Sequence, residues 1–170
     1  MILGMTTATY TFVHVLISLI GIGSGFIVLY GLLSRKQLDG WTALFLATTV
    51  ATSVTGFGFP AHKLLPSHVI GILSLVVLTL AIFARYIFHL AGAWRRVYIV
   101  GAIVALYFNV FVAIVQAFEK NPMLKALAPT QKEAPFVATQ LLVMASFIVL
   151  GIVAVKKSRI ESVRITARAA

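Results

Sequence analysis

The chain has 170 residues, of which 61% are hydrophobic and only 11% are charged, and it contains no cysteine. Because an ordinary soluble domain carries about 25% charged residues, a chain this short cannot hide so much apolar surface from water, and lipid must be its solvent. The lack of cysteine excludes disulfides, thiolate metal sites and thiol catalysis. The net charge of +10 is spread over the connections between apolar runs, which favours membrane topology over a nucleic-acid partner.

Five apolar runs follow one another along the chain. Each is close to the ~20 residues that cross a hydrocarbon core about 30 Å thick, and lipid requires them to be helical because it offers the backbone no hydrogen bonds. The sequence therefore predicts an all-α integral membrane bundle with five transmembrane helices in one domain, residues 1–155, followed by a basic tail, residues 156–170. The predicted spans are residues 11–33, 41–59, 69–91, 97–118 and 136–155.

The lysines and arginines outside the spans predict the orientation of the bundle. Nine lie on one side: Arg35, Lys36, Arg95, Arg96, Lys156, Lys157, Arg159, Arg164 and Arg168. Four lie on the other side: Lys63, Lys120, Lys125 and Lys132. The positive-inside rule then places the N-terminus outside and the C-terminus in the cytoplasm. There the tail can rest on anionic inner-leaflet lipids, and each basic residue contributes about 1 kcal/mol.

Uncharged polar side chains concentrate in the predicted outer half. From the helical rise, Gln116 and Gln140 lie roughly 3–6 Å below the outer boundary and Asn109 roughly 14 Å below it, near the midplane. Polar groups in membrane spans usually face the bundle interior or a cavity. Two interpretations are open: the side chains bridge helices, at about 0.6 kcal/mol per bond, or they line a pocket open to the outside. The residues in question are His14, Ser18, Thr52, Thr55, Asn109, Gln116 and Gln140.

The histidines suggest a more specific chemistry for that pocket. His14 and His68 are placed near the outer ends of two helices that run in the same direction. Two facing histidines could ligate a b-type haem, and three, with His62, could hold zinc or copper. No carboxylate lies nearby to orient such a ligand, and histidines without metals are common.

Arg85 is the charged residue that falls inside a predicted span, four residues before His89. It lies about 9 Å from the inner boundary, and a charged residue inside the membrane is a functional candidate by default. Two simpler roles are open: its side chain reaches lipid phosphate by snorkelling, or it forms an ion pair with Asp39. No catalytic carboxylate is available inside the bilayer, because all four acids lie outside the spans and on two sides. The sequence therefore argues against an enzymatic function.

Two stretches resemble segments of small, uncharacterised bacterial inner-membrane proteins: WTALFLATTVATSVTGFGFPAHKLLPSH, and LYFNVFVAIVQAF followed by LKALAPTQKEAPF. The resemblance covers about residues 13–155. It implies a multi-pass protein of the bacterial inner membrane, and it adds no catalytic residues, since no activity is established for that group.

We therefore expect a non-enzymatic binding or accessory component, present as a homo-oligomer or within a larger membrane complex. A redox protein that binds haem b or a metal is the first alternative. A small channel or solute carrier formed by an oligomer is the second.

Overall fold

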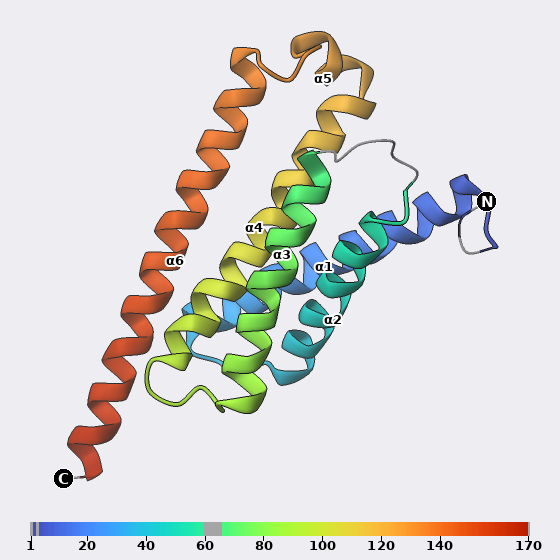
Figure 1. The fold of residues 1–170 in the computed structure, drawn as a ribbon. Coiled ribbons are helices and arrows are strands. Elements are labelled where there is room, and N and C mark those ends of the chain that lie inside the picture. The colour runs from blue at the N-terminus through green and yellow to red at the C-terminus, as the bar shows by residue number, and fades with distance from the viewer. Residues whose placement is uncertain (1, 3, 60–65, 170) are drawn as a thin grey trace.

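The computed structural model describes residues 2, 4–59 and 66–169, and of residues 66 and 159–169 only the backbone. The described chain is helical, with one isolated bridge between Ile2 and Met5. The elements, shown in Figure 1, are α1 (Thr7–Ser34), α2 (Asp39–Gly56), α3 (Pro66–Ile82), the π-helix η1 (Phe83–Ile87), α4 (Trp94–Lys120), α5 (Pro122–Leu127) and α6 (Ala134–Ala169).

Four segments are long and apolar enough to cross a membrane. They are Thr7–Ser34, Ser67–Ile87, Trp94–Lys120 and Ala134–Ser158. Each corresponds to one of the predicted spans, because a run of apolar side chains that must satisfy its own backbone in lipid has no alternative to helix. The all-α prediction is confirmed, and the chain is a multi-pass membrane protein.

Helix α2 is the exception among the predicted spans. It has 18 residues, which gives a length of about 27 Å. Asp39 at its first position and a series of threonines make it less apolar than the other four long helices. A fifth crossing by α2 therefore stays a prediction.

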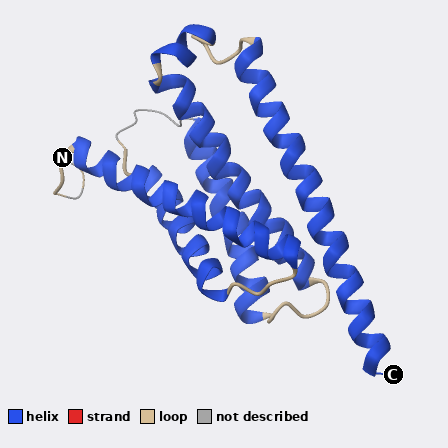
Figure 2. Ribbon diagram, turned by 180° about the vertical axis from the view of Figure 1, so that it is seen from behind, coloured by secondary structure: helices blue, strands red, loops and turns tan. Residues whose placement is uncertain are grey.

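The long helices form two pairs that are inclined to each other. Helix α1 lies beside α2, α3 lies beside α4, and α6 lies along α4. Figures 1 and 2 show α1 running obliquely across α4, whereas α3, α4 and α6 run nearly along one another. The pairs converge where α1 ends and α2 begins, which we call the closed end. They diverge toward the N-terminus of α1 and the C-terminus of α4, which we call the open end.

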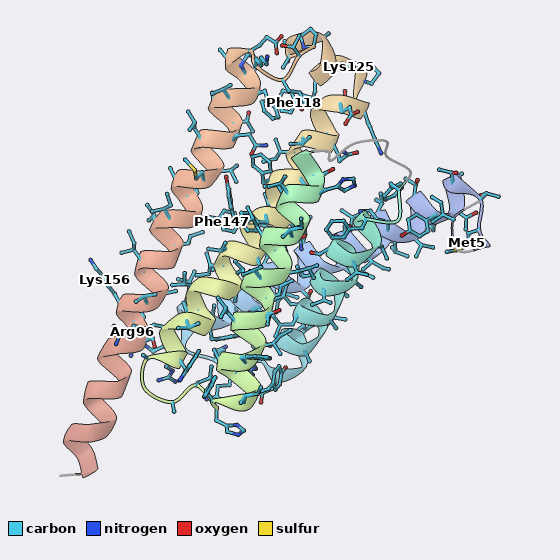
Figure 3. All side chains as sticks on the ribbon, in the orientation of Figure 1. Met5, Arg96, Phe118, Lys125, Phe147 and Lys156 are labelled. Atoms are coloured by element: carbon cyan, nitrogen blue, oxygen red, sulfur yellow. The ribbon has the colours of Figure 1, made fainter. Side chains whose placement is uncertain are left out.

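Helix α1 crosses α4 and α2 at close range because a glycine lies at the point of contact. A Cβ added to Gly25 of α1 would lie 2.5 Å from Leu106 Cδ1 of α4 and 2.9 Å from Phe45 Cε2 of α2. Phe45 and Leu106 are each 1% exposed. Small residues allow such close approach between membrane helices. From this crossing the buried core continues past Ala81 and reaches Phe147 of α6, which lies between α6 and α4 in Figure 3.

The third predicted span, residues 69–91, ends earlier than expected. Its α-helical part stops at Ile82, and the π-helix continues to Ile87. His89 (φ 46°) and Leu90 (φ 58°) then adopt the left-handed conformation that reverses the chain. Residues 88–91 are mostly apolar and carry no breaker, so the sequence pattern did not reveal this turn. His89 lies beyond the helix and does not form the predicted i, i+4 pair with Arg85 on a helix face.

Candidate functional site

A cavity of about 550 Å³ lies in the open half of the bundle, between the diverging helix pairs. Its walls come from α1, α2, α3 and α4 and from Phe57 and Phe59, which follow α2. Side chains such as Leu19, Ile70 and Phe108 make most of the wall apolar. The polar residues that line it are Thr11, His14, Ser18, Thr52, Ser53, Ser67, His68, Ser74, Asn109, Gln116 and Lys120.

Most of the side chains predicted for a common pocket lie at this cavity. Those that line it are His14, Ser18, Thr52, His68, Asn109 and Gln116. Thr55 lies behind the lining and contacts His14, with 2.8 Å between Thr55 Oγ1 and His14 Nδ1. His62 lies outside the described residues.

Gln140 is placed elsewhere. It is 8% exposed and lies against α4, where its Nε2 donates to the Phe111 carbonyl oxygen at 3.2 Å. None of the described residues of α6 lines the cavity, because α6 packs along α4 outside the space between the two pairs. The side-chain oxygen of Gln140 is buried without a hydrogen-bond partner in the described chain. Gln140 and Gln116, for which the helical rise predicts a similar depth, therefore do not share a site.

Many of the hydroxyl groups at the cavity are already bonded within the protein. Ser18 Oγ donates to the His14 carbonyl oxygen at 2.7 Å, and Ser53 Oγ donates to Ser74 Oγ at 3.1 Å. These bonds bridge turns of helix or neighbouring helices, as hydroxyls in membrane spans commonly do. Thr52 differs, because its Oγ1 is buried and has no hydrogen-bond partner among the residues that the structure describes.

Asn109 lies at the deep end of the cavity. Its Nδ2 donates to Thr49 Oγ1 of α2 at 3.2 Å, and Asn109 is 9% exposed. Gly21 of α1 lies against this contact, since a Cβ there would be at an ordinary van der Waals distance, 3.5 Å, from both Asn109 Nδ2 and Thr49 Oγ1. The amide therefore joins α4 to α2 and also contributes to the lining, so bridging and lining are not exclusive roles.

The hydrogen bonds around His14 assign its tautomer. Thr55 Oγ1 donates its single hydrogen to the carbonyl oxygen of Ala51 at 2.7 Å. With that hydrogen bond made, Thr55 Oγ1 accepts in its contact with His14, which favours the tautomer that has a hydrogen on Nδ1. In the neutral imidazole the lone pair is left on Nε2. The ring is held edge-on against Phe59, with 5.2 Å between ring centroids.

His68 lies on the opposite wall, near the start of α3. Its ring stacks on Phe57 with 5.6 Å between centroids, and both residues line the cavity. The structure therefore places two of the four histidines around one cavity. Within the described residues, no group of three or more His, Cys, Asp or Glu side chains could hold a metal ion. The predicted three-histidine site includes His62, which is not described.

Apart from His68, the wall contributed by α3 was missed by sequence reasoning. Ser67, Gly71 and Ser74 line the cavity, and their spacing of i, i+4 and i+7 puts them on one helix face. Gly71 allows Phe57 to approach, since an added Cβ would lie 3.1 Å from Phe57 Cζ. This small and polar stripe was the signal that could have identified α3 as a wall.

Arg85 and Asp39 are far from the cavity, at the closed end, where they form an ion pair between η1 and the first residue of α2. The Arg85 side chain is 13% exposed and that of Asp39 is 75% exposed. The guanidinium also lies over the ring of Tyr98, 5.2 Å from its centroid. Of the two roles proposed for Arg85, snorkelling to lipid phosphate and an ion pair with Asp39, the structure shows the ion pair. His89 is exposed at the same end.

Comparisons of the chain with protein-family models, with curated proteins and with solved structures found no match.

Proposed function

We propose that the chain is a non-enzymatic binding protein of the bacterial inner membrane, and that the cavity of its open half is the binding site. The observation that supports this most directly is the cavity itself. Its volume of about 550 Å³ lies within the ~300–1,000 Å³ that is typical of small-molecule sites. Its mainly apolar walls with a few polar groups are also typical of such sites.

The polar groups favour a particular chemistry for the ligand. The Thr52 hydroxyl has no partner among the described residues, and its oxygen is buried. A buried hydroxyl without a partner costs about 1–3 kcal/mol, so a rotation of this side chain that lets a ligand bond to it is favoured. The lone pair of His14 Nε2 can accept a hydrogen bond from a ligand. A neutral group that both donates and accepts, such as a hydroxyl or an amide, suits these two side chains. The apolar part of the ligand would lie against Ile22, Ile70 and Val112, which also line the cavity.

The proposed arrangement has five spans, with the cavity facing outward. The basic residues at the closed end support it under the positive-inside rule. A reporter that is active only outside the cytoplasm should work when fused at Pro129 and should fail when fused after Arg168. The reverse pattern would contradict the proposed orientation.

Cysteine labelling tests the cavity directly, because the chain has no cysteine of its own. Asn109→Cys and Gln116→Cys should each react with a small water-soluble thiol reagent added from the outside. Gln140→Cys is the matched control, since Gln140 lies at a similar depth and outside the lining, and it should not react. If none of the three reacts in folded protein, the cavity is not accessible and the binding proposal fails. Reaction of Gln116→Cys alone would mean a shallower site.

The haem or metal alternative is favoured by one observation at His14. A histidine that ligates a metal usually donates its other ring N–H to a fixed acceptor, as His14 Nδ1 does to Thr55. An absorption spectrum of detergent-purified protein separates the two functions. A Soret band that is lost in His14→Ala and His68→Ala would select haem binding. A featureless spectrum, with no metal by elemental analysis, would leave the binding of a neutral ligand.

A further inference from the structure

The cavity of the open half is closed on three of its sides by contacts between neighbouring helices. Tyr10 Oη of α1 donates to the Thr55 carbonyl oxygen of α2 at 2.7 Å, and Ser53 of α2 donates to Ser74 of α3. Helix α3 runs beside α4 (Figure 1). The fourth side, between α1 and α4, differs. In the described chain, the hydrogen bonds that α1 makes to other helices go to α2 and α6 and not to α4.

At this fourth side the lining of the cavity continues onto the outer surface of α1. Val15 and Leu19 both line the cavity, yet they are 42% and 58% exposed. Leu16 and Phe12 lie three and seven residues before Leu19, so they are its neighbours along the helix surface. They are 47% and 68% exposed and are not part of the lining. The cavity therefore has a lateral opening between α1 and α4, at Val15 and Leu19.

The lateral opening lies at the level of the hydrocarbon layer. Helix α1 is one of the four segments that are long and apolar enough to cross a membrane. Leu19 comes eight residues after Thr11, where the predicted span begins, which is about 12 Å along the helix. Because the side chains at the opening are apolar, a lipid chain can lie in it without contact with water. Each methylene group then keeps the ~0.8 kcal/mol that it gains in the bilayer.

We propose that the ligand of the cavity is a single-chain lipid with a neutral, hydroxylated head group, which enters from the bilayer through the lateral opening. This inference rests on the proposed function of the cavity as a binding site. The head group lies between α1 and α2, where His14 contacts Thr55 and Thr52 lies one helical turn deeper. The chain extends past Leu19 into the lipid. A volume of about 550 Å³ holds a ligand of drug size, which suits one chain better than the two of a phospholipid.

The charges of the lining favour a neutral head group. Lys120 is the one Lys, Arg, Asp or Glu among the described residues that line the cavity. It is the last residue of α4, so it lies at the mouth of the cavity and not beside Thr52. An ionised head group deep in the cavity would leave water without an ion partner, which is costly. A hydroxyl loses less, because His14 and Thr52 can replace its hydrogen bonds to water.

The test measures lipid binding to the full chain in a neutral detergent by native mass spectrometry. The probe is monooleoylglycerol, and three compounds are compared with it. Methyl oleate has the same chain but no hydroxyl, oleate has an anionic head group, and glycerol has no chain. Monooleoylglycerol should bind more tightly than all three. If oleate binds more tightly, or methyl oleate equally tightly, the neutral hydroxylated head group is wrong. If glycerol binds equally tightly, the ligand is not a lipid.

Two pairs of variants locate the head group and the opening. Thr52→Val removes the hydroxyl at the head group. Its matched control is Thr79→Val, since Thr79 is exposed, lies outside the lining and bonds to a carbonyl of its own helix. Leu19→Trp narrows the lateral opening. Leu16→Trp adds the same ring to the same helix outside the lining. Circular dichroism checks that each variant folds, and Leu19→Phe replaces Leu19→Trp if that variant does not.

Thr52→Val should weaken the binding of monooleoylglycerol about fivefold, the loss expected from one neutral hydrogen bond. Leu19→Trp should weaken it about fivefold or more, because the ring overpacks the path of the chain. Each control should change it less than about twofold. If a variant and its control weaken binding equally, the head-group site or the lateral opening, respectively, is wrong.

Failure of this inference can be told apart from failure of the proposed function. If Asn109→Cys and Gln116→Cys stay unlabelled by the water-soluble thiol reagent, the cavity is not accessible and the proposed function fails. If both are labelled and monooleoylglycerol does not bind, the inference of a lipid ligand alone is overturned. In Leu19→Trp the labelling of Asn109→Cys should persist, because the reagent enters from the aqueous mouth and the lipid from the side.

Discussion

The same helices form both halves of the bundle, but they pack closely in one half and leave a cavity in the other. Around the crossing, Gly25 meets Phe45 and Leu106 with no room for a Cβ, and the neighbouring Ala81 and Ala84 are fully buried. Toward the open end, the same helices leave a cavity of about 550 Å³. Two helices inclined to each other stay in contact only near their crossing. The close approach on one side therefore produces the open space on the other.

The two halves also differ in whether a buried polar group has a hydrogen-bond partner. At the closed end, Arg85 has Asp39 as a partner and Tyr98 donates to Thr42. In the open half, the Thr52 hydroxyl is buried without a partner among the described residues. A paired group contributes to stability, whereas an unpaired buried hydroxyl costs free energy that a hydrogen bond to a ligand would recover. Under the proposed function, the closed half holds the helices together and the open half binds the ligand.

The largest expected effect comes from filling the crossing. Gly25→Leu should destabilise the bundle by about 1–3 kcal/mol, because the added side chain overpacks a site with no space. Gly23→Leu is the matched control: it lies two residues away, and a Cβ there meets nothing within 4 Å. Thermal denaturation in detergent measures both variants. Equal melting temperatures would show that the crossing is not as close as described.

A smaller effect is expected from the ion pair at the closed end. Arg85→Gln and Asp39→Asn should each destabilise the protein, and the double variant should be no worse than the worse single one. A coupling of about 1 kcal/mol is expected, the upper range for exposed pairs, because Arg85 is largely buried and Asp39 is not. A double-mutant cycle measures it. Arg96→Gln serves as a control at an exposed position. Additive losses in the double variant would mean that the side chains of Arg85 and Asp39 do not interact.

The smallest effect separates two threonines on α2. Thr49→Val removes the acceptor of Asn109 and should cost about 0.6 kcal/mol, the average for such bonds in membranes. Thr52→Val removes a hydroxyl that has no partner and should leave stability in the absence of ligand unchanged or slightly higher. Both substitutions conserve shape, so their difference in melting temperature reports the hydrogen bond. A larger loss for Thr52→Val would mean that Thr52 is bonded in the folded protein.

The class of the protein, its helices and the depth of each polar group follow from the amino-acid sequence alone. Lipid forces long apolar runs into helix, and the rise per residue converts position into depth. That reasoning predicts one level for His14 and Gln116 and a deeper position, near the midplane, for Asn109. It also identified Asp39 as a candidate partner of Arg85.

The tertiary structure was needed to decide which polar groups at one level meet. Depth does not specify rotation about the helix axis or the angle at which two helices cross, since both depend on side chains from two segments at their contact. Gln116 therefore lines the cavity while Gln140, at a similar depth, packs on the outside of α4. Likewise, the close crossing at Gly25 depends on side chains from α1, α2 and α4 together, and the divergence of α1 from α4 beyond it opens the cavity.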